Sequence, residues 1–245
     1  MDPSNLSLEP AVVIHTRAYK ESSLIVELFT KNKGRVTTIA KGVKRPKNRL
    51  RSILTPTSIF SLSTSGRGEM KNIISCEVVE AFLFNSKETL SSIFYINELI
   101  YKFFEKEDPH KEIFYQYSLL LRSLSRESDL KNLEYFLRIF ELKILNEVGY
   151  GINLTTEANS DQRIVPNKFY SFNPEEGFKE FAFNKNQDND LIFPGQDIID
   201  LGEGNLDNLS TRKSSKIITR KSIDLHLGSR KINIRKFFKQ QKINK

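Results

Sequence analysis

Residues 11–42 read AVVIHTRAYKESSLIVELFTKNKGRVTTIAKG, and residues 57–80 read TSIFSLSTSGRGEMKNIISCEVVE. The two stretches hold five short runs rich in Val, Ile, Thr and Phe, residue types that are enriched in strands. Glycine-containing turns separate neighbouring runs at 33–34 and 66–68. Five strands without an intervening helix, joined by one long connection at 41–53, predict a small closed barrel. The OB-fold is the commonest five-stranded barrel and binds oligonucleotides and oligosaccharides. An SH3-like barrel fits the strand spacing as well.

From Lys87 onwards the apolar residues change to helical spacing. Apolar residues three and four positions apart mark one face of a helix. They predict three consecutive helices, at 87–104, at 108–124 beginning with Asp108-Pro109, and at 129–148 with Asp129 as N-cap. Weaker helical patterns follow at 195–201, 208–227 and 232–240.

The segment 151–190 has no periodicity and is rich in Asn, Asp, Pro and Gly. It predicts an irregular, cysteine-free insert with a loop or short hairpin around Tyr170–Phe178. The predicted fold class is therefore α+β. A five-stranded OB-fold barrel at 1–81 precedes an α-helical domain at 82–245 that contains the insert.

Several classes of protein are excluded by what the sequence lacks. It has no run of about 18 apolar residues, which a membrane span needs, and no signal-peptide pattern. A cytoplasmic protein without a membrane partner is the expectation. Cys76 is the single cysteine, which excludes an internal disulfide and a multi-cysteine zinc site. His15, His110 and His226 are far apart in sequence, and phosphate-loop, dinucleotide and hydrolase motifs are absent. The sequence therefore predicts no enzyme, no cofactor and no metal site.

The charge is unevenly distributed along the chain. The net charge is +8, yet nine basic residues and no acidic one lie in 31–51, and twelve basic residues with one acid lie in 211–245. The remainder carries −12. A chain that is acidic except in two dense patches places positive potential at particular positions, as nucleic-acid-binding proteins do.

The connection KGVKRPKNRLR, residues 41–51, carries six cations in eleven residues. A charge run is usually a solvated loop. At this density, however, like charges repel one another unless a polyanion is bound, so we expect contact with nucleic acid. The predicted DNA-binding residues are Arg35, Lys41, Lys44, Arg45, Lys47, Arg49, Arg51 and Arg67. A possible secondary basic surface comprises Arg212, Lys213, Lys216, Arg220, Arg230, Lys231 and Arg235.

Aromatic residues are scarce in the predicted barrel. Of 26 Phe and Tyr residues, only Tyr19, Phe29 and Phe60 precede residue 82. Many OB-folds hold single strands by stacking bases on aromatic rings, and this barrel offers few. Its affinity is then expected to come mostly from phosphate electrostatics, which is independent of sequence. Binding of this kind leaves base edges free and suits a protein that anneals strands.

On the third predicted helix, Tyr135, Arg138, Leu142 and Leu145 share a face. A cation flanked by apolar groups is what an acidic peptide with a hydrophobic end requires. The alternative is helix packing, with Arg138 paired to Glu134 or Glu141. The pattern alone favours that alternative.

The ordered set of motifs resembles the RecO family of recombination mediators. The motifs are Tyr19–Thr30, Gly34-Arg35-Val36, Ala40-Lys41-Gly42, Ser65–Lys71, Tyr95–Leu99, Asp108-Pro-His110, Phe140-Glu-Leu142 with Gly149-Tyr-Gly151, Pro174–Phe178, Leu227–Arg230 and Ile234–Phe238. The resemblance implies an OB-fold, binding to single- and double-stranded DNA, strand annealing, and help in loading a RecA-type recombinase onto coated strands. It also implies a cytoplasmic, nucleoid-associated protein.

The implied partners are RecR and the acidic, Phe-terminated tail of single-stranded-DNA-binding protein (SSB). The resemblance implies that this tail docks at Arg138, which precedes Phe140-Glu-Leu142. Many members of the family carry a four-cysteine zinc site after the Gly-Tyr-Gly motif. Residues 151–178 contain no cysteine, so no zinc is expected here.

Two other classes of function stay open. A nuclease or nucleotide-dependent enzyme could use the basic loop to hold its substrate, although the acidic residues are scattered. An RNA-binding or ribosome-associated barrel protein would also account for the basic patches.

Overall fold

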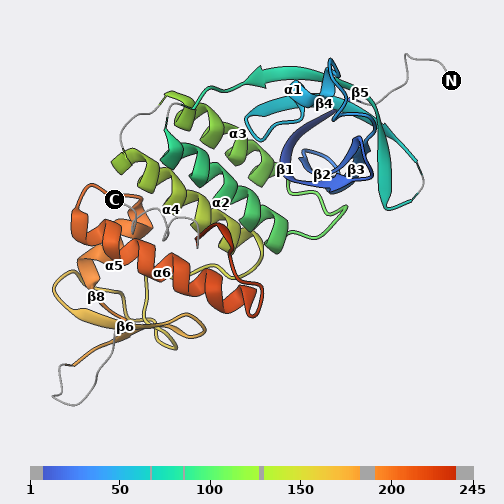
Figure 1. Cartoon of the computed structure of the whole chain (residues 1–245). Helices are drawn as coiled ribbons and strands as arrows, with labels where there is room; N and C mark the ends of the chain where they lie inside the picture. Colours follow the sequence, from blue (N-terminus) through green and yellow to red (C-terminus); the bar gives the residue numbers. More distant parts are fainter. Residues whose placement is uncertain (1–7, 67, 85, 127–129, 183–190, 236–245) are drawn as a thin grey trace. The chain divides into compact units, whose positions relative to one another are not determined.

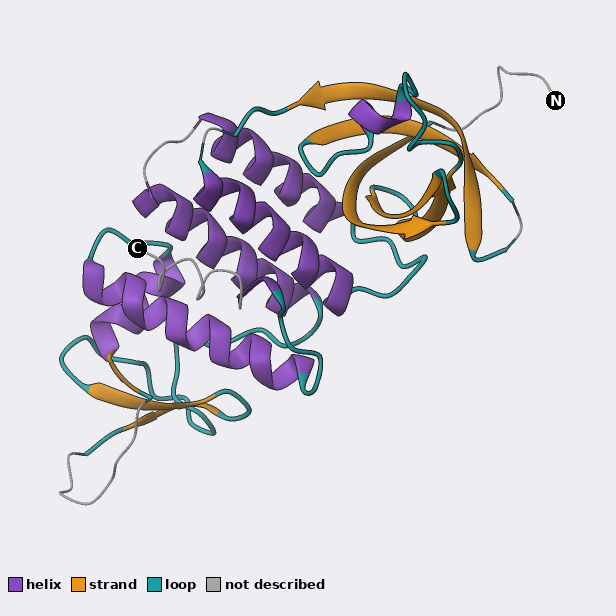
Figure 2. Ribbon diagram, in the orientation of Figure 1, coloured by secondary structure: helices purple, strands orange, loops and turns teal. Residues whose placement is uncertain are grey.

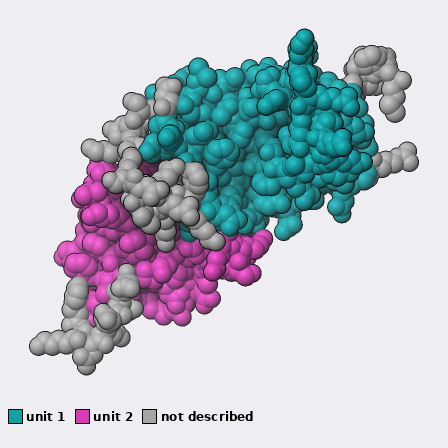
Figure 3. Space-filling model, in the orientation of Figure 1, with its two compact units in different colours: residues 1–129, 232–245 teal, residues 130–231 magenta. Residues whose placement is uncertain are grey.

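The computed structural model describes residues 8–66, 68–84, 86–126, 130–182 and 191–235 (Figure 1). The chain divides into two compact units (Figure 3). Residues 1–129 and 232–245 form the first unit, and residues 130–231 form the second. The predicted domain boundary at 81/82 falls inside the first unit, in the short link between its barrel and its helices, and stays a prediction.

The first unit begins with a closed five-stranded barrel (Figure 2). Its strands are β1 (Glu9–Tyr19), β2 (Ser23–Thr30), β3 (Gly34–Ala40), β4 (Ser58–Ser65) and β5 (Met70–Ala81). Their order around the barrel is β1-β2-β3-β5-β4, with β3 and β5 parallel and the other pairs antiparallel. The predicted OB-type barrel is confirmed, and all five predicted strands are present.

The inside of the barrel is an apolar core. On β1, β2 and β4 its side chains come from alternate positions, as the period of two requires. The core comprises Ala11, Val13, Val26, Leu28, Ala40, Val43, Ile53, Leu54, Phe60 and Leu62. Seven of these ten residues come from the runs that predicted the strands, and the other three come from the connection between β3 and β4.

The outer face of β1–β3 is covered by two helices of the same unit, α2 (Lys87–Phe103) and α3 (Lys111–Arg126). Phe29 of β2 points outward, and its ring lies 5.9 Å from that of Phe104 and 5.8 Å from that of Phe114. Asn97 of α2 donates to the carbonyl of Val13 on β1 at 3.3 Å. The barrel and these helices therefore bury one continuous interface.

Strand β5 carries two irregularities that turn apolar residues outward. Its pairing with β4 shifts register at Ile74 and again at Val79. The extra residue of a β-bulge re-aims its side chain and increases the local twist. Ile74 is 54% exposed and Val79 is 65% exposed, so an apolar strip lies on the outside of β5.

The second unit combines helices with a small sheet. Its elements are α4 (Leu130–Glu147), β6 (Phe169–Asn173), β7 (Gly177–Glu180), β8 (Ile192–Pro194), α5 (Gly195–Glu203) and α6 (Leu209–Leu227). The sheet is antiparallel in the order β7-β6-β8. The hairpin predicted around Tyr170–Phe178 is confirmed, because β6 and β7 pair there.

The helices predicted at 87–104, 108–124, 129–148, 195–201 and 208–227 are also present, with small differences at their ends. The second begins at Lys111 rather than at Pro109. Asp108 does not cap it, since its carboxylate lies 3.2 Å from Nε2 of His110. Asp129 and residues 236–240 lie outside the described residues. No helix among the described residues is long and apolar enough to cross a membrane.

Candidate nucleic-acid interface

The basic loop, residues 41–51, is fastened to the barrel by its few apolar side chains. Val43 is 1% exposed and belongs to the barrel core, while Leu50 packs against that core from α1 (Leu50–Ile53). Ile53 and Leu54 fill the same core. The burial of these side chains holds the loop in place and leaves the polar residues between them facing outward.

Backbone hydrogen bonds shape the loop further. The amide of Arg45 donates to the carbonyl of Gly42 at 3.0 Å, and the side-chain amide of Asn48 donates to the same carbonyl at 3.0 Å. The carboxamide oxygen of Asn48 in turn accepts from the amide of Leu50 at 2.9 Å. Gly42 has φ +65°, a conformation that glycine adopts without strain. The loop is thus a defined turn.

All six cations of the loop are exposed, namely Lys41, Lys44, Arg45, Lys47, Arg49 and Arg51. Within the described ranges, none of them forms an ion pair with an acidic side chain. An ordered loop that holds six exposed cations provides a concentrated positive potential. This is the electrostatic pattern that attracts nucleic-acid phosphates.

The turn between β1 and β2 lies directly beside the basic loop. The amide of Lys44 donates to the carbonyl of Ser22 at 2.9 Å, and the amide of Gly42 lies 3.4 Å from Oγ of Ser23. Lys20 in this turn and Arg17 at the end of β1 are both exposed. The sequence analysis missed these two cations because they are isolated in sequence and join the loop only through the fold.

Two of the predicted DNA-binding residues are not part of this surface. Arg35 is 7% exposed and turned towards α2. Its Nη1 donates to the carbonyl of Phe104 at 2.7 Å, its Nη2 lies 3.6 Å from Glu27, and its guanidinium carbon lies 4.2 Å from the Tyr101 ring centroid. The prediction for Arg35 was wrong, because the helices cover that face of β3. Arg67 lies outside the described residues.

The aromatic residues of the barrel strands are mostly buried. Phe29 and Phe60 are fully buried, and Tyr19 is half-buried. These three rings therefore do not form a surface on which bases could stack.

The predicted secondary basic surface is only partly available. Nη1 of Arg212 donates to the carbonyls of Leu206 and Asp207, at 2.9 and 2.6 Å. Nζ of Lys216 lies 2.8 Å from Oε1 of Glu134, and Nη2 of Arg235 lies 3.2 Å from the hydroxyl of Tyr95. Arg220 is half-buried, whereas Lys213, Arg230 and Lys231 are exposed. The exposed cations of α6 are Lys213 and Lys221, and the sequence analysis omitted Lys221.

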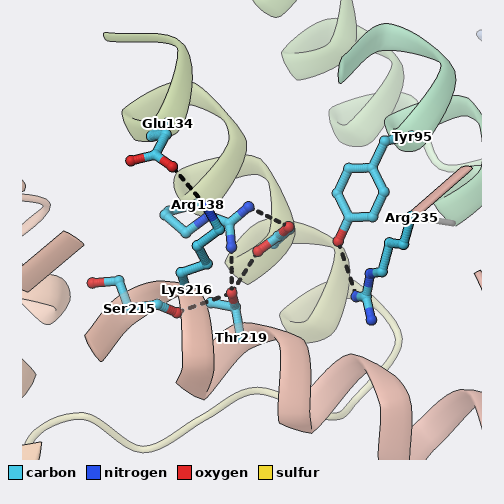
Figure 4. A network of polar contacts seen from close by, with 8 residues as sticks. Tyr95, Glu134, Arg138, Ser215, Lys216, Thr219 and Arg235 are labelled. Carbon is cyan, nitrogen blue, oxygen red and sulfur yellow. Dashed lines mark hydrogen bonds and ion pairs between the residues drawn. The ribbon is translucent and has the colours of Figure 1, made fainter. Parts of the chain in front are cut away.

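The arginine of the predicted peptide site on α4 is engaged by neighbouring side chains (Figure 4). Arg138 is 3% exposed, and Leu145 is fully buried. Nη2 of Arg138 lies 2.7 Å from Oε1 of Glu141, and Nη1 donates to Oγ1 of Thr219 on α6 at 3.1 Å. Tyr135 is exposed and Leu142 is half-buried. The prediction of an accessible Arg138 was wrong. The alternative reading, an ion pair with Glu141, is the observed arrangement.

The cysteine and one histidine have shifted pKa values. Burial, with a smaller contribution from Glu77, raises the pKa of the Cys76 thiol to about 11. The His226 ring stacks on Tyr150 at 3.8 Å, and burial lowers its pKa against an opposing effect of Glu175. No group of three or more potential metal ligands occurs among the residues that the structure describes.

Comparison with known proteins identifies the relatives of this chain. The sequence profile described as Recombination protein O N terminal matches residues 5–82, and the profile described as Recombination protein O C terminal matches residues 86–232. The DNA repair protein RecO of Actinobacillus pleuropneumoniae serotype 5b (strain L20) is 31% identical over 233 residues, 95% of both chains. That of Methylococcus capsulatus is 34% identical over 238 residues, 97% of this chain and 95% of the relative. That of Salmonella gallinarum is 35% identical over 230 residues, 94% and 93% of the two chains.

Proposed function

Since the chain belongs to the RecO family of DNA repair proteins, we propose that it is a recombination mediator and not an enzyme. In this role it binds single- and double-stranded DNA and anneals complementary strands. It also helps to load a RecA-type recombinase onto strands coated by SSB. The observation that carries the DNA-binding part is the ordered basic loop with its six exposed cations.

The loop suits annealing for an electrostatic reason. Two complementary strands repel each other through their phosphates, and this repulsion slows their encounter. Lysine and arginine side chains that neutralise phosphates reduce the repulsion without occupying the base edges. Lys20 and Arg17 extend the positive surface beyond the loop, so that more than one phosphate group can be bound at once.

We propose that RecR, a partner implied by the family, contacts the β5 strip. Four exposed apolar residues belong to β5, namely Met70, Ile74, Val78 and Val79, and the exposed Leu83 follows its end. Exposed apolar patches of this kind mark protein interaction sites. Val79→Glu is expected to weaken RecR binding in a pull-down while DNA binding persists. If the variant bound RecR as well as the wild-type protein does, RecR would not contact the β5 strip.

We propose that the acidic SSB tail docks on α6 rather than on Arg138. Ile217 is 40% exposed, and the exposed cations Lys213 and Lys221 lie one turn before and one turn after it. Residues four positions apart share a helix face. This face therefore offers an apolar side chain between two cations, which matches an acidic peptide with a hydrophobic end.

An annealing assay tests the proposed function. The protein is expected to accelerate the pairing of complementary oligonucleotides, both naked and SSB-coated, with EDTA present and ATP absent. A strand without a complement and RNA of the same sequence serve as controls. Loss of DNA binding in EDTA, or turnover of ATP by the pure protein, would favour the enzyme alternative. A clear preference for structured RNA would favour an RNA-binding protein.

A further inference from the structure

We propose that His15 and Tyr101 form a stacking site for a base of single-stranded DNA on the outside of the barrel. This inference rests on the proposed DNA-binding function and deepens it. The rings come from two elements of the first unit, β1 and α2. Tyr101 lies outside the stretch of sequence that forms the barrel, so a count of barrel aromatics does not include it.

The two rings form a surface pair. Their centroids are 5.3 Å apart and their planes are inclined by 35°. His15 is exposed, and Tyr101 is 37% exposed. An aromatic pair that served only the core would be covered, as the stacked rings of Phe29 and Phe104 are. The His15–Tyr101 pair instead remains partly accessible to solvent.

The buried Arg35 fixes the tyrosine ring in place. Its guanidinium carbon lies 4.2 Å from the Tyr101 ring centroid, a distance typical of a cation–π contact. The same guanidinium is held by the carbonyl of Phe104 and by Glu27. A ring that is already oriented loses little conformational entropy when a base stacks on it.

The backbone of β1 directs His15 outward. The pairing of β1 with β2 shifts register between Val13 and His15, and afterwards His15 lies opposite Glu27 and Arg17 opposite Ile25. His15 and Arg17 therefore share the outer face and lie about 6.6 Å apart along the strand. The exposed Arg17 can bind a phosphate while the adjoining base contacts His15.

A continuous path of cations links this pair to the basic loop. Arg17 is followed by Lys20 in the β1–β2 turn, and the backbone of that turn is hydrogen-bonded to Lys44 through Ser22. A single strand bound to the loop by its phosphates would thus reach the aromatic pair along β1. Of the available ligands, the combination of aligned cations and an exposed ring pair fits single-stranded DNA best.

The experiment compares a thymidine oligonucleotide with an abasic strand of equal length, which keeps the phosphates and lacks the bases. One stacked base contributes about tenfold to affinity, so the full-length protein is expected to prefer the thymidine strand by about that factor. His15→Ala should abolish the preference. His15→Phe should retain it, because phenylalanine stacks but carries no charge. Tyr115→Ala, which removes a 53% exposed ring from α3, is the matched control and should change nothing.

A 2-aminopurine base in the oligonucleotide gives a second readout, since stacking quenches its fluorescence. Quenching by the wild-type protein and by His15→Phe, but not by His15→Ala, is the expected result. Equal affinity of the wild-type protein for the two strands, or an unchanged preference in His15→Ala, would overturn the stacking site while leaving phosphate binding intact. Failure to bind either strand would overturn the proposed function itself.

Discussion

Nη2 of Arg138 lies 2.7 Å from Oε1 of Glu141, one turn further along α4, and the two side chains are 4% and 0% exposed. Thr219 of α6 accepts from the arginine and donates to the carboxylate. The arginine is therefore committed to a buried network inside the second unit. It is a determinant of stability there, as the helix-packing alternative implied, although the family resemblance pointed to a docking residue.

Arg138→Ala is expected to reduce the free energy of unfolding by about 3–5 kcal/mol, because it leaves the Glu141 carboxylate buried without its cation. Urea denaturation followed by circular dichroism measures this change. The double variant Arg138→Met with Glu141→Leu removes both charges and should recover most of the loss. If Arg138→Ala unfolded at the same urea concentration as the wild-type protein, the pair would be energetically unimportant.

The basic loop is tested by reversing Lys44 and Lys47 to Glu. The log–log salt dependence of single-strand binding should flatten by about 1.4 units, or 0.7 for each lost phosphate contact. Fluorescence anisotropy at several salt concentrations gives the slope. The matched control reverses Lys31 and Lys33, two exposed cations in the β2–β3 turn at the other end of β3. A larger effect in the control would place the phosphate contacts at that end of the barrel.

Arg35 should behave as a structural residue. Arg35→Gln leaves Glu27, which is 5% exposed, without its cation, and an unpaired buried carboxylate costs about 3–5 kcal/mol. The thermal midpoint is expected to fall while the salt slope of DNA binding at low temperature stays the same. If the variant were stable and the salt dependence of its DNA binding were weaker, Arg35 would contact DNA after all.

Cys76 gives a prediction about pH. Burial raises the pKa of its thiol from 9.0 to about 11, so at pH 8 the folded protein holds little thiolate and should react slowly with a disulfide reagent. Reaction should accelerate in denaturant. Between pH 9 and 11 the unfolded chain loses a proton that the folded chain retains, and the linkage relation then makes stability fall as pH rises. Fast reaction of the native protein at pH 8 would contradict the raised pKa.

The barrel could be predicted from sequence because its strands are locally encoded. Alternating Val, Ile and Phe residues with glycine turns define β1 to β5 without reference to distant residues. The residue pattern of a strand or helix does not reveal whether another element will cover its outer face. The sequence therefore groups Arg35 with the exposed cations, and it does not show that Arg138 is buried against Thr219 of α6.

The candidate interface contains cations that the sequence reveals and cations that only the fold brings together. Lys41 to Arg51 form a visible run in the sequence, and the structure keeps its six cations exposed. Lys20 and Arg17 join them only because the β1–β2 turn is hydrogen-bonded to the loop. Contacts of this kind depend on strand order, which periodicity alone does not specify.

The covered outer face of β1–β3 has a consequence for protein engineering. A fragment that ended at residue 81 would contain all five strands, yet it would uncover Phe29 and deprive Arg35 of the Phe104 carbonyl. Gly34 would lose its neighbour Asp108, whose carbonyl oxygen lies so close that a side chain at position 34 has no room. We therefore expect the isolated OB barrel of this protein to be unstable without the two helices. Any chimera that transplants it must carry α2 and α3 along, although the family profiles divide between residues 82 and 86.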